Sequence, residues 1–340
     1  MEWVRGKTIG HGSFATISLA QPTTHNSSLP PLMAIKSCGV SHSASLIYEK
    51  HILTELTNCP EIIHCFGDCF TVENGIKIYN IALEYASGGD LFYNLKNFGN
   101  FLLSEVRRYT NSILKGLQFI HRNGFVHCDI KLQNILLLSE GDNADVKIAD
   151  FGLAKKVAGE SKSKYEIRGT PMYMAPETVV SGEQEPPSDI WALGCLVAEM
   201  ITGNPAWFCS DIGALLFKIG VGTEIPEIPG DLSSAGKDFL GKCFLKDPRE
   251  RWTAEMLLNH PFVSKEEAED CIFSRSISPR DPFDFTVWES AELLEMAQLP
   301  LPELSNLSPV ILPAARLRRL AVDDADGPNW SDSSRWVRVR

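Results

Sequence analysis

Four polar side chains in the stretch from Phe125 to Gly152 have the types and the spacing of a reaction centre. Asp129, Lys131 and Asn134 fall within six residues, and Asp150 follows sixteen residues after Asn134. Hard Mg²⁺ prefers oxygen ligands such as a carboxylate and an amide, which Asp150 and Asn134 carry. The carboxylate of Asp129 would then be free to accept the proton of an attacking hydroxyl. This combination predicts a site that transfers the γ-phosphoryl group of a metal-bound triphosphate.

A glycine-containing turn near the amino terminus is the first element expected to position a phosphate. Residues 3–20 alternate as two strands around the turn G-H-G-S-F-A. Gly10, Gly12, Ala15 and Ile17 follow the order G-x-G-x-x-G-x-V, with alanine at the third glycine. An ordinary tight hairpin is the alternative, because the pattern alone is weak. The position between two strands argues against a dinucleotide fingerprint or a Walker loop.

A lysine and a glutamate follow with the spacing of an ion pair beside a phosphate. Lys36 ends the short apolar strand M-A-I-K, and Glu49 lies thirteen residues later in a segment of helical periodicity. The apolar residues at helical spacing in that segment are Leu46, Ile47, Leu53 and Leu56. The strand end resembles the motif V-A-I-K, and this resemblance implies that Lys36 binds the α- and β-phosphates while it is paired with Glu49. Taken alone, each of the two would be an ordinary solvated side chain.

The segment L-E-Y-A-S-G-G-D-L predicts a strand, an extended connection and the start of a helix. In this hinge the backbone of Glu84 and of Ala86 would meet an adenine edge, and Leu83 would gate the pocket behind it. Asp90 would cap the helix, reach the ribose, or do both.

A small β-rich part therefore precedes a larger helical part, which predicts the fold class α+β. Apolar runs at 62–70 and 76–83 complete an antiparallel sheet before the hinge. After it, a long amphipathic helix is expected from Ser104, as its cap, to Gly124, as its stop.

Composition and charge limit the classes of protein. With 340 residues, 44% of them hydrophobic, the chain can bury a substantial core, and by length it would hold two or three domains. The net charge of -11 argues against nucleic acid as the main partner, because binding to a phosphate backbone needs a basic face. No signal-like segment and no run of 18 apolar residues is present, so we expect an intracellular protein without membrane attachment.

Nine scattered cysteines, an odd number, indicate a reducing compartment rather than a disulfide framework. Cys59, His64, Cys65 and Cys69 form a cluster that suggests zinc, but no second ligand pair completes it. Buried cysteines are the preferred interpretation.

In this order and at these spacings, the motifs resemble those of the eukaryotic protein kinase family from about Trp3 to Val263. The motifs that carry the resemblance are the glycine turn, Ala34-Ile35-Lys36, Glu49, His127-Cys128-Asp129 with Asn134, Asp150-Phe151-Gly152, Gly169-Thr170-Pro171, Ala175-Pro176-Glu177, Ser188-Asp189-Ile190-Trp191 and Arg251. The resemblance implies a bilobal protein kinase fold over 1–263, with an N-lobe of about 1–84 and a C-lobe of about 91–263. Residues 264–340, where Pro, Ser, Asp and Glu become frequent, would form a largely disordered regulatory or docking tail.

The resemblance also implies a role for each site residue, with ATP and Mg²⁺ as cofactors. Asp129 would be the catalytic base and Lys131 would steady the transferred phosphoryl group, while Lys36 and Glu49 complete the catalytic set. Asn134 and Asp150 would be the metal ligands. The residues implied in nucleotide binding are Ile9, Gly10, Gly12, Ser13, Phe14, Ile17, Ala34, Lys36, Leu83, Glu84, Ala86, Asp90, Asn134, Leu136 and Asp150. Structural roles would fall to the ion pair of Glu177 with Arg251 and to Asp189, which would hold the catalytic-loop backbone.

Lys131 and the segment G-T-P-M-Y-M-A-P-E are similar to the serine/threonine branch of the family. The catalytic loop H-C-D-I-K and the segment S-P-R-D-P-F-D-F-T-V-W-E-S are most similar to the short plant MAP kinase kinase kinases. This similarity implies a monomeric kinase that phosphorylates MAP kinase kinases in stress or hormone signalling. Its location would be the cytoplasm, or also the nucleus. A serine/threonine kinase outside this cascade and a pseudokinase scaffold stay open as alternatives. A scaffold need not retain the full set Lys36, Glu49, Asp129, Asn134 and Asp150.

Cys128 departs from the family pattern, and the departure has a regulatory consequence. The family carries an arginine at this position, which grips a phosphorylated residue of the activation loop. We therefore expect phosphorylation at Ser161, Ser163 or Tyr165 to be a weaker switch, and the unphosphorylated protein to have substantial basal activity. As the alternative, a modified residue could still find a cationic partner among Lys155, Lys156, Lys162, Lys164 and Arg168. An apolar setting would keep the Cys128 thiol inert, with a redox role as the alternative.

Overall fold

The structure, a computed structural model, describes residues 2–12, 15–23, 29–139, 145–157, 167–209 and 211–264, together with the backbone of 337–338. Ser13 and Phe14, both expected at the nucleotide, lie outside the described residues, as do Ser161, Ser163 and Tyr165. The expected tail is also outside them, apart from its first residue and 337–338. Within the described part, no helix is long and apolar enough to cross a membrane.

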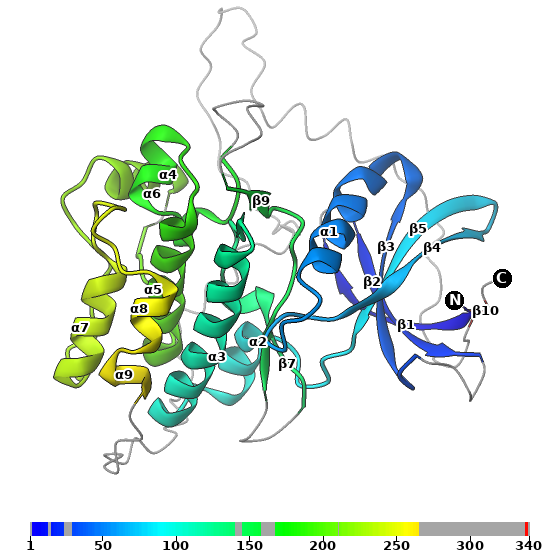
Figure 1. Ribbon diagram of the computed structural model, residues 1–340, viewed down its shortest axis with the longest axis horizontal. Helices are drawn as coiled ribbons and strands as arrows, with labels where there is room; N and C mark the ends of the chain where they lie inside the picture. Colours follow the sequence, from blue (N-terminus) through cyan, green and yellow to red (C-terminus); the bar gives the residue numbers. More distant parts are fainter. Residues whose placement is uncertain are drawn as a thin grey trace, which may run out of the picture. The chain divides into compact units, whose positions relative to one another are not determined.

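An antiparallel sheet and one helix make up the N-lobe, drawn in blue to cyan in Figure 1. The strands are β1 (Trp3–His11), β2 (Thr16–Pro22), β3 (Met33–Gly39), β4 (Cys65–Glu73) and β5 (Ile76–Glu84). Their order is β10-β1-β2-β3-β5-β4, where β10 is the two-residue strand Val337–Arg338. The expected glycine hairpin joins β1 to β2, with Gly10 opposite Ile17 and the Gly12 N–H donating to the Ala15 carbonyl (2.7 Å).

One face of this sheet encloses a small apolar cluster that continues into a polar network. The apolar members are Trp3, Ala20, Met33, Ile35 and Ala82. Beside them, the Arg5 guanidinium donates to Ser37 Oγ (3.0 Å), Glu73 Oε1 (2.8 Å) and Asn80 Oδ1 (2.8 Å). One side chain thus links β1 to β3, β4 and β5. A register shift in β1 directly after Arg5 marks a β-bulge, which increases the local twist of the strand that leads to the glycine turn.

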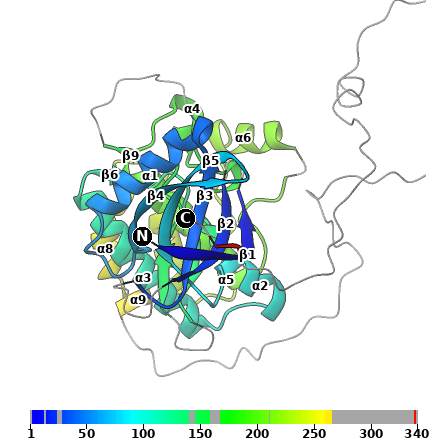
Figure 2. The ribbon, with the colours of Figure 1, turned by 90° about the vertical axis from the view of Figure 1, so that its right-hand side faces the viewer.

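Helix α1 (Ser43–Glu55), preceded by the 3₁₀ turn Val40–His42, packs on the sheet, as Figures 1 and 2 show. Leu46, Leu53 and Leu56 are buried as their spacing predicted, but Ile47 is 44% exposed. The predicted helix is present, and Ile47 lies at the edge of the stripe of α1 that faces the lobe. The apolar run at 62–70 also divides: β4 begins only at Cys65, and Ile62 instead forms a parallel bridge with Ile148 of the C-lobe.

The C-lobe is predominantly helical. Its helices are α2 (Leu91–Phe98), α3 (Leu103–Arg122), α4 (Pro176–Ser181), α5 (Pro186–Thr202), α6 (Ile212–Gly220), α7 (Ser234–Cys243), α8 (Ala254–Leu258) and α9 (Pro261–Ser264). Helix α5 is buried on all sides from Ser188 to Met200, so it forms the centre of the lobe. The α+β, bilobal arrangement is thereby confirmed.

The start of α3 differs from the prediction. Ser104 was expected as the cap, but the helix begins at Leu103, and the Glu105 carboxylate accepts the N–H of Leu102 (2.8 Å). An acidic side chain in the first turn satisfies the N–H of the cap residue and complements the helix dipole, so the helix begins without a serine cap. The expected stop is confirmed: Gly124 has φ +76° and its N–H donates to the His121 carbonyl (3.0 Å).

Two short two-stranded sheets carry the loops between α3 and α4. Strand β6 (Phe125–Val126) pairs with β9 (Lys155–Lys156), and β7 (Ile135–Leu137) pairs with β8 (Val146–Ile148). Two 3₁₀ turns, Leu132–Asn134 and Pro171–Tyr173, lie in the connecting segments. Asp129, Lys131, Asn134 and Asp150 therefore lie on short segments that are anchored by strands at both ends.

Candidate active site

The loop from His127 to Asn134 is held by a carboxylate of the buried helix α5. Asp189 Oδ2 accepts from the His127 N–H (2.9 Å) and lies 2.9 Å from His121 Nε2, while Oδ1 accepts from the Cys128 N–H (2.9 Å). Burial alone would raise the pKa of Asp189, but the contacts with His121 and His127 lower it, so the group stays charged. Cys128 has φ +67°, a conformation that costs a non-glycine residue about 1–2 kcal/mol. Asp189 thus holds a strained backbone directly before Asp129, as its position in the motif predicted.

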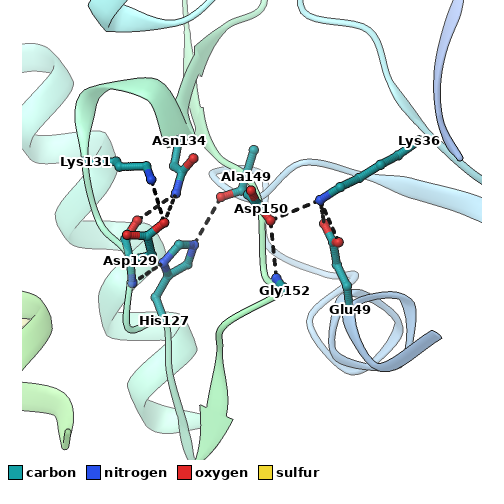
Figure 3. A network of polar contacts seen from close by, with 9 residues as sticks. All are labelled: Lys36, Glu49, His127, Asp129, Lys131, Asn134, Ala149, Asp150 and Gly152. Atoms are coloured by element: carbon teal, nitrogen blue, oxygen red, sulfur yellow. Dashed lines mark hydrogen bonds and ion pairs between the residues drawn. The ribbon is translucent and has the colours of Figure 1, made fainter. Parts of the chain in front are cut away.

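Asp129, Lys131 and Asn134 converge within this loop (Figure 3). The Asn134 amide nitrogen donates to Asp129 Oδ2 (3.0 Å) and to the Asp129 carbonyl (2.8 Å). Lys131 Nζ lies 2.8 Å from Asp129 Oδ2. The His127 ring accepts from the Asp129 N–H at Nδ1 (3.3 Å), so Nε2 carries the proton that it donates to the Ala149 carbonyl (3.1 Å). The Asp129 carboxylate is therefore fixed in orientation and almost fully buried.

Thr170 completes this group, although the sequence indicated it only as part of a motif. Its hydroxyl donates to Asp129 Oδ1 (2.8 Å) and accepts from Lys131 Nζ (2.9 Å). Gly169, immediately before it, has φ +103°, and a Cβ at this position would lie 2.3 Å from the Cys128 carbonyl oxygen. Only glycine fits here, and its lack of a side chain brings Thr170 to the catalytic loop. The motif G-T-P was the available sequence signal for Thr170, but its contact with Asp129 joins positions that are 41 residues apart.

Lys36 joins the two lobes (Figure 3). Its ammonium group lies 2.7 Å from Glu49 Oε2 on α1 and 3.0 Å from Asp150 Oδ1. Burial alone would lower the pKa of Lys36, but the two carboxylates raise it. For Asp150, burial would raise the pKa, and the attraction of Lys36 together with its hydrogen bond lowers it. The predicted pairing of Lys36 with Glu49 is present, and both Lys36 and Asp150 are held in their charged forms.

The oxygens of this site fit a divalent metal bound to a triphosphate. The contacts of Asp150 with Lys36 and with the Gly152 N–H (3.4 Å) both use Oδ1, and half of its side chain is exposed. Asn134 uses Nδ2 for its bonds to Asp129, so its amide oxygen is the atom left for a cation. One carboxylate oxygen and one amide oxygen form a hard donor set, which suits Mg²⁺. Asp150 has φ +62°, which re-aims its side chain between the lobes.

The apolar residues expected around the nucleotide lie on the two sides of the hinge. Ala34 and Leu83 are neighbours in the β3–β5 ladder and are buried. Ile17 and Leu136 are partly buried against the same core, and Ile9 is 41% exposed at the glycine hairpin.

At the hinge itself, the Glu84 N–H donates to the His64 carbonyl (2.9 Å), and the Glu84 carboxylate forms an ion pair with Lys147 (2.7 Å). Asp90 caps α2 by accepting the Tyr93 N–H (2.7 Å), so the capping role expected for it is confirmed. Leu136 forms an antiparallel bridge with Asp90, which ties the hinge to the floor of the site.

Two further expectations concern residues outside the reaction centre. Glu177 and Arg251 form the predicted ion pair, with Nη1–Oε1 at 2.6 Å and Nη2–Oε2 at 3.0 Å. The buried Cys59 thiol donates to a Glu61 carboxylate oxygen (3.3 Å). In the described parts of the chain, no group of three or more His, Cys, Asp or Glu side chains is arranged to hold a metal ion.

Comparison with known proteins gives a consistent relationship. A model of the protein kinase domain matches residues 3–263. The chain is 46% identical over 361 aligned positions to mitogen-activated protein kinase kinase kinase 20 of Arabidopsis thaliana, with 100% of both chains covered. It is 42% identical over 302 positions to mitogen-activated protein kinase kinase kinase 18 of the same plant, with 86% of each chain covered. The chain therefore belongs to the protein kinase family, as a serine/threonine kinase similar to plant MAP kinase kinase kinases.

Proposed function

We propose that this protein is a MAP kinase kinase kinase, which transfers the γ-phosphoryl group of ATP to serine or threonine residues of MAP kinase kinases. One observation carries the catalytic part: the Lys36 ammonium contacts Glu49 and Asp150 at once, so three segments of both lobes are assembled for phosphate chemistry. The similarity to mitogen-activated protein kinase kinase kinase 20 over the full length of both chains supports the substrate class.

Each residue then has a role that follows from its contacts. Asp150 and Asn134 would hold Mg²⁺ through their remaining oxygens, and Lys36 would place the α- and β-phosphates. When bound, ATP would supply the phosphoryl group, and Mg²⁺ would neutralise part of the negative charge of the phosphates. Asp129 is oriented to accept the proton of the attacking hydroxyl, and Lys131 is close enough to stabilise charge on the phosphoryl oxygens.

The rival class, a pseudokinase scaffold, is disfavoured by the same geometry. A scaffold has no need to keep Asp129 bonded on both carboxylate oxygens or to keep the Asn134 amide nitrogen bonded to Asp129. These polar groups are buried at a cost that only their shared contacts offset. An enzyme uses that arrangement, because preorganised groups need no reorganisation during the reaction.

The test is transfer of labelled phosphate from Mg-ATP to MAP kinase kinases that carry an inactivating substitution of their own. The wild-type protein should phosphorylate their activation loops, and Lys36→Met and Asp150→Asn should each abolish the signal. Lys77→Met, an exposed lysine on β5, is the matched control and should retain full activity. Equal signal from wild type and from both site variants would reveal a contaminating kinase and refute the proposal.

A further inference from the structure

The segment that delivers Thr170 to the catalytic loop is clamped by a buried glutamine. Gln184 is 4% exposed. Its Oε1 accepts the Arg168 N–H (3.2 Å), and its Nε2 donates to the Arg168 carbonyl (2.7 Å). One amide therefore satisfies both backbone groups of one residue, which fixes the position and the direction of the chain there.

The loop that carries Gln184 is itself anchored on α4 and α5. The Thr178 hydroxyl donates to the Glu183 carbonyl (2.9 Å), and the Ser188 hydroxyl donates to the Glu185 carbonyl (2.7 Å). Both anchoring side chains are buried. The clamp therefore rests on the most buried helix of the C-lobe and not on a freely moving turn.

The effect of the clamp reaches Asp129 through two residues. Arg168 precedes Gly169, which has no Cβ and therefore lets the chain pass close to the Cys128 carbonyl. Thr170 follows and bonds to Asp129 and Lys131 at once. On the far side of Thr170, Tyr173 donates a hydrogen bond to the buried Glu199 of α5. The segment is thus held at both ends, with the Thr170 hydroxyl between them.

In the described residues, Lys155 and Arg168 close to this segment already have partners within the protein. Cys128 is mostly buried, its thiol donates to the Val126 carbonyl (3.7 Å), and burial raises its pKa, so it is neutral. Lys155 of β9 is paired with Glu185 (3.4 Å). The Arg168 guanidinium donates to the Leu153 carbonyl (3.5 Å). Contacts within the protein therefore hold the described part of this segment.

We propose that Gln184 is a positioning residue, which keeps the Thr170 hydroxyl between Asp129 and Lys131 and makes catalysis independent of activation-segment phosphorylation. The inference rests on the proposed kinase function. In other regulated enzymes, charge-assisted contacts to a phosphate order a segment of this kind. Here the neutral side-chain amide of Gln184 would order it.

The first measurement compares steady-state kinetics of phosphatase-treated wild type, Gln184→Met and Gln118→Met, with an inactivated MAP kinase kinase as substrate. Gln184→Met keeps the volume but breaks both bonds, so kcat should fall on the order of tenfold. KM for ATP should stay unchanged, because Lys36 and Asp150 are not touched. Gln118→Met makes the same chemical change in α3 and should behave as wild type. Gln184→Asn, one methylene shorter, is a second variant in which the same split between kcat and KM is expected.

A double-mutant cycle separates positioning from a merely structural role. Thr170→Val removes the hydroxyl that Gln184 places, so adding Gln184→Met to Thr170→Val should lower kcat by less than twofold. Independent, multiplying losses would overturn the inference, and so would a rise in KM for ATP equal to the fall in kcat. If only the phosphorylated wild type has activity, the clamp does not suffice and the inference is wrong. If neither form of the wild type has activity, the proposed function itself is contradicted.

Discussion

Replacing Asp189 with asparagine should destabilise the fold far more than the same replacement at the surface. The carboxylate accepts three hydrogen bonds at 2.9 Å, from the backbone of His127 and Cys128 and from His121. Asparagine has the same shape, but one of its two terminal atoms is an NH₂ group, which cannot accept. Whichever way the amide turns, at least one buried N–H then faces another donor.

The magnitude follows from these contacts. A hydrogen bond to a charged group contributes about 1.5–3 kcal/mol, and a buried donor without an acceptor costs a further 1–3 kcal/mol or so. The remaining bonds weaken as well, because their acceptor is no longer charged. We therefore expect Asp189→Asn to lower the free energy of unfolding by about 3–5 kcal/mol, a large share of the total for a domain. Release of the left-handed Cys128 backbone should also lower kcat.

Equilibrium unfolding in urea, followed by tryptophan fluorescence, measures the effect. Asp238→Asn is the matched control, since Asp238 also pairs with a histidine, His260 (3.0 Å), but is 58% exposed. An exposed pair contributes about 0–1 kcal/mol. Equal losses for the two variants would refute the reasoning from burial.

The difference in the free energy of unfolding between wild type and Asp189→Asn should depend on pH, which gives a second check. The pKa of Asp189 is lower in the folded than in the unfolded state, so its contribution is complete above the ordinary carboxyl pKa of about 3.9. The contribution is lost as the pH falls through the lower folded value. The difference in the free energy of unfolding between the two proteins should therefore be constant near neutral pH and should decrease only at acidic pH.

Two further outcomes test the polar network of the N-lobe and the thiols. Arg5→Met should lower the free energy of unfolding by about 2 kcal/mol, because Glu73 loses its partner in a partly buried position. The double variant Arg5→Met/Glu73→Met should recover most of that loss. Purely additive losses of the two variants in urea unfolding would contradict this prediction. Iodoacetamide at neutral to mildly alkaline pH should modify the exposed Cys209 of the native protein and spare Cys128, whose pKa is raised by burial. Equal labelling of the two cysteines by peptide mass spectrometry would show that Cys128 is accessible and reactive.

Much of the fold was predictable because its signals are local. Strand alternation, the glycine turn and the stop at Gly124 depend on the backbone preferences of neighbouring residues. The sequence was less informative where a distant surface decides. Ile47 has helical spacing with its neighbours, yet it lies at the edge of the buried stripe. Ile62 extends an apolar run of the N-lobe, yet it bridges to Ile148 of the C-lobe.

By itself, the sequence determined which chemical groups are present and in what order, because motif spacing fixes residue types along the chain. Asp129, Asn134 and Asp150 were identified in this way, and so was the departure at Cys128. Only the tertiary structure decided which groups meet: Lys36 and Asp150 are 114 residues apart in sequence, and their contact requires both lobes. No sequence pattern indicated the role of Gln184. Its amide bonds to the backbone of Arg168, so the contact depends on the path of the chain and not on the type of the Arg168 side chain. Contacts to backbone atoms leave no pattern in the partner's residue type, and for that physical reason they emerge only from the folded chain.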